Sequence, residues 1–188
     1  MLDFQKACRV VLKEGEDLLS TLDEKVVQDF LKKVKEEWPQ KRLFFWARGR
    51  SFLMLRGFAM RLMHMGYEVH IVGEVDCPAI AKGDVLLVAS GSGGTSSVLL
   101  FAEKAHHFGA EVGAIVGKPG SPLGTQADWV LEFNPEQAGE TVQLSSAGGG
   151  TRFEHSLLLF FDACILSLIF DQREKAYQDM MRRHANLE

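Results

Sequence analysis

The chain has no excess of basic residues. Its 21 lysines and arginines are outnumbered by 25 aspartates and glutamates, which gives a formal net charge of -4 at pH 7. A protein of this charge has no general electrostatic attraction for polyanions, so nucleic acid is not expected as its main partner. A small charged ligand, held by a local site, remains compatible with this composition.

Cysteines and long apolar runs are also scarce. The cysteines, Cys8, Cys77 and Cys164, are widely spaced and form no paired motif that would bind zinc or act as a redox pair, so we expect ordinary thiols and no metal site. The longest apolar stretch, 157–170, contains Asp162 and is too short to span a bilayer comfortably. The first residues lack the apolar core and cleavage site of a signal peptide, so we expect a soluble, cytoplasmic protein without a membrane partner.

Apolar spacing predicts helices and strands in alternation. Residues 4–38 carry apolar positions at helical spacing among many charges, which predicts about two amphipathic helices that end before Pro39. Further on, helical patterns at 50–66 and 96–109 are separated by short apolar runs. These runs are typical of buried strands and lie at 42–47, 68–73, 84–89, 111–117 and 128–133.

The remaining segments complete the predicted organisation. Turn residues dominate 118–127, the polar and glycine-rich stretch 134–150 is predicted as a loop, and a mostly buried helix follows from 151. Strands that are apolar throughout favour a parallel sheet covered on both faces. We therefore expect an α/β protein, a three-layer αβα sandwich with a five-stranded parallel sheet. The expected single domain, 1–188, has a helical lead (1–39), a sandwich core (40–172) and a charged C-terminal helix (173–188).

One short segment stands out for its lack of side-chain bulk. Residues 90–97, SGSGGTSS, combine three glycines with five hydroxyl residues directly after a predicted strand. In an open parallel sheet, ligands bind beyond the carboxyl ends of the strands, where this segment and ARGRS at 47–51 both lie. Glycines such as Gly91 let an anion approach the backbone, and the N–H groups at a helix start point toward it. The hydroxyl groups that can donate to an oxygen are those of Ser51, Ser90, Ser92 and Thr95.

These features predict a phosphate site. The common nucleotide-binding motifs, G-x-x-x-x-G-K-[ST] and G-x-G-x-x-G with its acidic partner, are absent, which favours a phosphate ester on a small molecule. Arg48 and Arg50 flank Gly49 in the first loop and can clamp phosphate, although a surface or intersubunit salt bridge explains them equally well. The alternative for the second loop is a glycine-rich turn whose serines cap a helix without any ligand.

Residues 90–133 resemble the core of the sugar isomerase (SIS) domain family, whose second loop commonly runs S-x-S-G-x-[ST]. Residues 49–74, 78–87 and 151–163 are similar to the 6-phospho-3-hexuloisomerases within that family. The chain departs from their usual pattern at Ala47, Arg48, Phe52, Gly94 and His155.

The resemblance implies a reaction and a set of residues. It implies interconversion of D-arabino-hex-3-ulose 6-phosphate and fructose 6-phosphate, without metal or cofactor, in the ribulose monophosphate route of formaldehyde fixation. It also implies a functional link to 3-hexulose-6-phosphate synthase and a homo-oligomer, expected to be a tetramer. The phosphate-contacting hydroxyls would be those named above, the first loop would be shaped by Gly49 and Arg50, and the general base would be Glu154.

The isomerisation needs a base and a second proton-transfer group. Glu154 lies between a glycine-rich loop and an apolar helix, where desolvation is expected to raise its pKa, although a glutamate there also stabilises the helix dipole. The candidates for moving a proton between the two oxygens are His155, Glu74 and His64. His155 points about 100° round the helix from Glu154, so both face one site only near a helix end. We expect His64 to complement a helix dipole and Glu74 to lie at the crevice edge.

Other functions stay open at this point. The same loops would serve a non-catalytic sensor that binds a phosphosugar, or an isomerase of another phosphosugar such as arabinose 5-phosphate. A flavodoxin-like redox protein is a third alternative and requires a flavin site.

Overall fold

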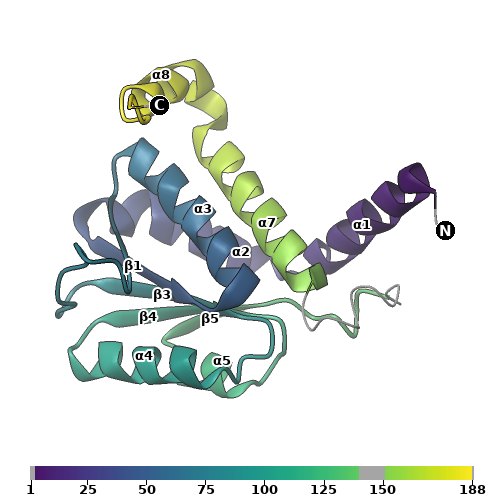
Figure 1. Cartoon of the computed structure of the whole chain (residues 1–188), viewed down its shortest axis with the longest axis horizontal. Helices are drawn as coiled ribbons and strands as arrows, with labels where there is room; N and C mark the ends of the chain where they lie inside the picture. The colour runs from purple at the N-terminus through teal and green to yellow at the C-terminus, as the bar shows by residue number, and fades with distance from the viewer. Residues whose placement is uncertain (1–2, 140–150, 188) are drawn as a thin grey trace.

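The computed structural model describes residues 3–139 and 151–187. At its centre is a five-stranded parallel sheet in the order β2-β1-β3-β4-β5 (Figure 1). Each strand lies within two residues of its predicted bounds at both ends. The strands are β1 (Arg42–Ala47), β2 (Glu68–Ile71), β3 (Val85–Ser90), β4 (Glu111–Val116) and β5 (Trp129–Glu132).

Helices cover both faces of the sheet, which confirms the predicted three-layer αβα sandwich (Figure 1). One face carries α4 (Ser96–His107) and α5 (Pro122–Gln126). The other face is packed by α2 (Glu24–Lys32), α3 (Gly49–Met65) and α7 (Thr151–Ile169), whereas α1 (Phe4–Leu19) lies against α7 and reaches this core with Leu18. Shorter turns are a π-helical turn (Lys33–Glu37) and 3-10 turns at Trp38–Gln40 and Phe170–Gln172, and the last of these leads to α8 (Arg173–Met181), which packs on α3.

The strand residues divide between the two faces as the pleat requires. Along β1, Leu43 and Phe45 join the core under α3 and α7, whereas Phe44 joins the core under α4. The core under α3 and α7 is held in part by the stacked rings of Phe58 and Phe161, whose centroids are 4.2 Å apart. Burial on both faces explains why the strands are apolar throughout rather than alternating.

The most apolar part of the chain is α7 and its continuation. By length and composition alone, Arg152–Met181 is a candidate membrane span, because its most apolar 18-residue window has a mean hydropathy of 1.8. In this structure 44% of its most apolar window is buried inside the protein. Leu157, Phe160 and Phe161 pack in the core, so the apolar composition of α7 is accounted for by its contact with the sheet and α3.

Residues 118–127, predicted only as turns, contain the short helix α5. Pro122 occupies its first turn, where a missing N–H and a fixed φ are compatible with a helix. The helix has only five residues, too few for an apolar period to show in the sequence.

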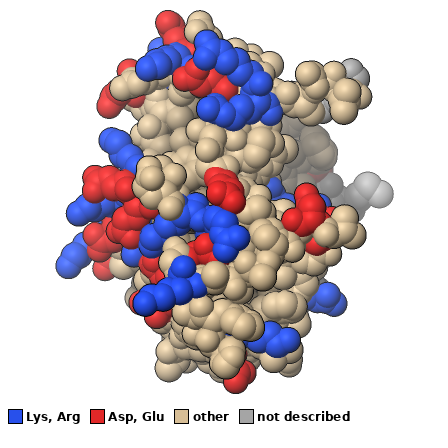
Figure 2. Space-filling model, turned by 90° about the vertical axis from the view of Figure 1, so that its left-hand side faces the viewer, with Lys and Arg blue, Asp and Glu red and all other residues tan. Residues whose placement is uncertain are grey.

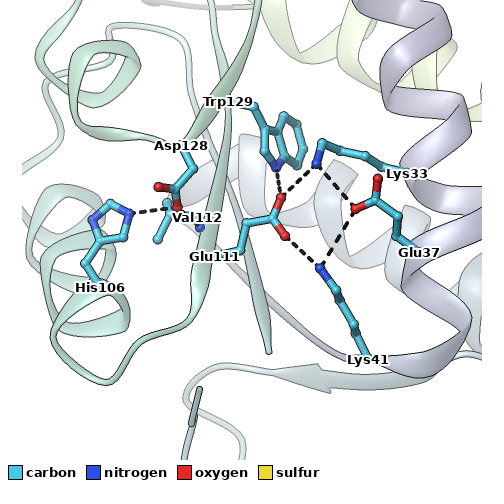
Figure 3. A network of polar contacts seen from close by, with 8 residues as sticks. All are labelled: Lys33, Glu37, Lys41, His106, Glu111, Val112, Asp128 and Trp129. Carbon is cyan, nitrogen blue, oxygen red and sulfur yellow. Dashed lines mark hydrogen bonds and ion pairs between the residues drawn. The ribbon is translucent and has the colours of Figure 1, made fainter. Parts of the chain in front are cut away.

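Charged residues of both signs meet where the strands begin. Arg42 pairs with Asp84, with 2.6 Å between Nη2 and Oδ2. Glu111 accepts hydrogen bonds from Lys33 (3.0 Å), Lys41 (2.8 Å) and the indole N–H of Trp129 (2.9 Å), as Figure 3 shows. The surface seen from the left-hand side of Figure 1 accordingly carries interleaved positive and negative side chains (Figure 2).

Candidate active site

The two predicted loops are neighbours at the carboxyl edge of the sheet. β1 and β3 pair side by side, with Ala47 opposite Ala89, so the segments that follow them leave the sheet next to each other. The strand order places β2 on one side of this pair and β4 on the other, which makes β1/β3 the switch point where open α/β sheets bind ligands. The first loop is short: Arg48 is the N-cap residue of α3, and Gly49 already begins that helix.

The second loop gathers hydroxyl and N–H groups at the start of α4. Ser90 Oγ and Thr95 Oγ1 are 3.0 Å apart, and Ser90 Oγ also accepts the N–H of Gly93 at 3.1 Å. Ser92 Oγ accepts the N–H of Gly94 at 3.3 Å. Thr95 is the N-cap residue of α4, but its hydroxyl makes no cap bond to the first N–H groups of this helix, while its carbonyl accepts the N–H of Val98 at 2.9 Å.

The shape of this loop depends on a glycine and on a serine that the sequence did not single out. Gly93 has φ +61°, a left-handed conformation that other residues rarely adopt, and a Cβ atom there would collide with the side chain of Ser121. The N–H of Leu123 donates to the Gly93 carbonyl at 2.9 Å. Ser121 is almost fully buried, and its hydroxyl has no partner among the described residues. The beginning of α5 therefore supports the second loop from beneath.

Glu154 is buried against the first loop. It lies in the first turn of α7, is 7% exposed, and its Oε1 accepts a hydrogen bond of 3.2 Å from the Ser51 hydroxyl. Burial raises the pKa of the Glu154 carboxyl, and the Ser51 hydrogen bond and the Arg50 charge only partly oppose this. The predicted upward shift is confirmed. A raised pKa makes this carboxyl a better proton acceptor than an exposed glutamate.

Phe153 joins the same turn to the second loop. A Cβ atom added at Gly91 would lie 3.2 Å from Phe153 Cδ1. At Gly117, after β4, an added Cβ would lie 2.9 Å from Phe153 Cδ2 and 2.8 Å from the Gly91 carbonyl oxygen. Because Phe153 packs directly on this backbone, the turn that carries Glu154 contacts both predicted phosphate loops.

His155 also faces the start of α3. Its Nε2 lies 3.5 Å from Arg50 Nη2, and since a guanidinium only donates, a hydrogen bond here requires Nε2 to accept and the ring proton to be on Nδ1. Nδ1 is buried without a partner among the described residues. Burial and the Arg50 charge lower the pKa of His155, while the charge of Glu14 raises it, and the net result is a lowered pKa. The first turn of α7 thus carries both side chains toward the start of α3, where Glu154 contacts Ser51 and His155 contacts Arg50.

Glu74 is engaged elsewhere in the chain. It lies just beyond β2, and its Oε1 pairs with Arg56 Nη2 at 2.8 Å, with both side chains about half exposed. Among residues 3–139 and 151–187, no hydrogen bond or ion pair joins Glu74 to Glu154 or Ser51.

His64 lies at the wrong end of α3 for proton transfer. Thirteen residues separate it from Ser51, which corresponds to about 20 Å along a helix. Its ring is buried and stacks on His184, with centroids 5.2 Å apart. Burial lowers the pKa of His64, and the charges of His184 and Arg61 lower it further. His64 does lie in the last turn of α3, where it was expected to complement the helix dipole, but its lowered pKa disfavours the charged form that this role requires.

In the described part of the chain, no three His, Cys, Asp or Glu side chains are grouped to hold a metal ion.

Comparison with known proteins identifies the family. The SIS domain family matches residues 38–147, which include all five strands and both loops. The chain is 40% identical to the 3-hexulose-6-phosphate isomerase of Bacillus subtilis over 149 residues, 78% of this chain and 80% of that one. It is 43% identical to the enzyme of the same name from Mycobacterium gastri over 148 residues, 78% of this chain and 74% of that one.

A solved structure agrees over nearly the whole chain. A hypothetical protein from Methanococcus jannaschii, whose structure was taken to infer a molecular function of 3-hexulose-6-phosphate isomerase, is 30% identical. It superposes with a TM-score of 0.80 over 97% of this chain and 99% of that one. With the family match spanning the sheet and both loops, the chain belongs to the SIS domain family.

Proposed function

We propose that this protein is a phosphosugar isomerase that interconverts D-arabino-hex-3-ulose 6-phosphate and D-fructose 6-phosphate. The observation that supports this most strongly is the position of Glu154. Its carboxyl is buried, bonded to Ser51 of the first loop, and carried by a turn that Phe153 packs against the second loop. The names of the curated relatives point to the same substrate.

The two loops would hold the phosphate of the substrate. On one side are the hydroxyls of Ser90, Ser92 and Thr95 with the N–H groups that begin α4; on the other is the start of α3 at Gly49. Bonds from such donors to a phosphate are charge-assisted and stronger than neutral ones. Phosphate in this position would leave the carbonyl end of the sugar next to Glu154.

Glu154 would then carry out both carbon proton transfers. As a carboxylate it removes the proton from C2 of the 3-ulose, and the C2–H electron pair forms the C2=C3 bond while O3 takes a proton. The resulting cis-enediol gives up the proton on O2, the C2 carbonyl forms, and Glu154 returns its proton to C3. One carboxylate on one face serves both steps, and its raised pKa suits a group that must accept and release a proton at working pH.

We assign the exchange between the two oxygens to His155. The lowered pKa favours its neutral imidazole, and because Nδ1 is buried, Nε2 would accept the proton from one oxygen and donate it to the other. Arg50, beside it, would stabilise negative charge that develops on the enediol oxygens. Glu74 is another candidate from the sequence, but its ion pair with Arg56 leaves His155 the better placed group.

The setting of the enzyme follows from the same proposal. The substrate would come from a 3-hexulose-6-phosphate synthase, and the protein would act in the cytoplasm without a cofactor. We also propose a homo-oligomer, a tetramer as the resemblance implies. An interface between subunits is supported by large apolar side chains that are exposed along α7 and its continuation: Leu158, Leu166 and Phe170.

A coupled assay tests the proposal. Ribulose 5-phosphate, formaldehyde and 3-hexulose-6-phosphate synthase are mixed with this protein, and fructose 6-phosphate is measured. We expect fructose 6-phosphate only when both proteins and formaldehyde are present. Formation of arabinose 5-phosphate without formaldehyde would show an isomerase of a different phosphosugar. Binding of fructose 6-phosphate without any turnover would show a sensor.

A further inference from the structure

Arg152 is a buried arginine in the first turn of α7. It is 5% exposed, and its guanidinium donates to three backbone carbonyl oxygens. Nε donates to Glu14 of α1 at 3.1 Å, Nη1 donates to Gly139 at 3.4 Å, and Nη2 donates at close range to Ala138. One side chain thus joins α7 to α1 and to the chain that follows β5.

This position is unfavourable for a cation unless something compensates. A guanidinium remains charged at all ordinary pH values, and burying a charge is costly without hydrogen-bonding partners. The N-terminal end of a helix also carries partial positive charge, which repels a cation in the first turn. Charge-assisted hydrogen bonds to the three carbonyl oxygens offset both the cost of burying the charge and the repulsion by the helix end. The planar guanidinium fixes the directions of these hydrogen bonds.

The anchored turn is the one that carries Glu154. Residues 152 and 154 are two positions apart, about 200° round a helix, so Arg152 holds one side of the turn while Glu154 extends from the other toward Ser51. The contact between α1 and α7 is close as well, because a Cβ atom added at Gly15 would lie 3.0 Å from Leu159 Cδ1. The first turn of α7 is therefore fixed from the side of α1.

We propose that Arg152 is a positioning residue, which fixes the first turn of α7 so that the Glu154 carboxyl stays buried against Ser51. The inference rests on the proposed role of Glu154 as the base, and it makes the N-terminal helix α1 a support of the site. Arg152 contacts neither loop in the part of the chain that the structure describes, so it acts only through the turn.

Loosening this turn would change the surroundings of Glu154. The groups near its carboxyl are the Ser51 hydroxyl and the Arg50 guanidinium, with His155 adjacent and Glu14 acting on His155. Since burial is the main cause of the raised pKa of Glu154, a turn that moves toward solvent lowers that pKa. The geometry of proton transfer is lost at the same time.

Matched variants test the proposal. Arg152→Gln removes the charge and the fork, Arg152→Lys keeps the charge, and Arg42→Gln makes the same change in an arginine at the opposite edge of the sheet. We expect Arg152→Gln to lower kcat by about 10- to 100-fold, since a misplacement of about 1 Å costs on the order of 100-fold. KM should change by a smaller factor than kcat, because Arg152 itself contacts neither phosphate loop and reaches them only through its neighbours in the turn. Arg152→Lys should be intermediate, and Arg42→Gln should lower the melting temperature without changing kcat.

A second measurement does not depend on turnover. The pKa of Glu154 is followed by carbon-13 NMR of glutamate-labelled protein, with Glu154→Gln to assign the signal. We expect the pKa to fall in Arg152→Gln and to stay unchanged in Arg42→Gln. If the wild type converts no phosphosugar, the proposed function fails, yet this fall still supports positioning by Arg152. An unchanged pKa of Glu154 in Arg152→Gln overturns the inference. If Arg152→Gln does not fold, the same measurement on Arg152→Lys takes its place, with a smaller expected fall in the pKa of Glu154.

Discussion

Replacing Glu154 by glutamine isolates its proton-transfer role. The amide has nearly the same size and keeps an oxygen that can accept the Ser51 hydroxyl at the observed 3.2 Å, but it cannot take a proton from carbon. General-base catalysis contributes about 10²- to 10⁴-fold, or about 3–5 kcal/mol, so we expect kcat to fall by that factor. The coupled assay measures kcat, and calorimetry should show fructose 6-phosphate binding within about threefold of the wild type.

The same variant should be more stable than the wild type at neutral pH. Because the folded-state pKa of Glu154 is raised, folding stability from this group is present below its unfolded pKa and is lost as the pH rises through the folded pKa. Glutamine carries no charge to bury, so thermal unfolding at about pH 8 should occur at a higher temperature in Glu154→Gln than in the wild type. The difference corresponds to about 2–4 °C per kcal/mol and should shrink toward about pH 4.

Two control variants test whether the loss of kcat in Glu154→Gln is specific to its proton-transfer role. Glu154→Asp keeps a carboxylate but withdraws it by one methylene, and we expect a loss on the order of 100-fold in kcat. Glu111→Gln alters a half-buried carboxylate in the network of Figure 3, where the strands begin, and should leave kcat unchanged. Retention of kcat in Glu154→Gln within about fivefold, where a base predicts at least 100-fold, would refute the reasoning, and so would an equal loss in Glu111→Gln.

Three further outcomes follow from the structure. Ser92→Ala should raise KM about tenfold with kcat nearly unchanged in steady-state assays, because it removes phosphate binding common to ground and transition states. Gly93→Ala should weaken binding of inorganic phosphate in calorimetry and destabilise the fold by at least about 1–2 kcal/mol, since it combines a left-handed φ with a collision against Ser121. Burial opposes ionisation of Glu111, but hydrogen bonds from Lys41 and Lys33 outweigh it and hold its pKa below the ordinary value. Glu111→Gln should therefore melt at a lower temperature than the wild type at about pH 7, and the difference between the two melting temperatures should shrink as the pH falls through that pKa.

The sheet was predictable from sequence because burial on both faces makes each strand a short apolar run that can be recognised on its own. β3 is buried along its whole length, so its apolar run marks it without ambiguity. The two phosphate loops were predictable for a related reason, since the carboxyl ends of parallel strands share one edge. The helix α5 was not predictable, because proline and glycine in 118–127 are typical of turns and five residues carry no period.

The site required knowledge of contacts between distant residues. Ser51 and Glu154 are 103 positions apart and meet only because α7 packs beside α3, so the role of Glu154 came from the family resemblance. Arg152 and Ser121 gave no signal in the sequence, where arginine is usually exposed and serine usually caps a helix. The burial of His64 against His184, which follows α8, was not predictable either, since it depends on tertiary packing.

Hydrogen exchange into fructose 6-phosphate tests the central claim most directly. The protein is incubated with this sugar in deuterium oxide, and proton NMR follows each carbon-bound hydrogen. Glu154 working across C2 and C3 predicts loss of the C3 proton signal with C1 untouched, and loss of that exchange in Glu154→Gln. Deuterium at C1 in place of C3, or undiminished exchange in Glu154→Gln, would contradict the account.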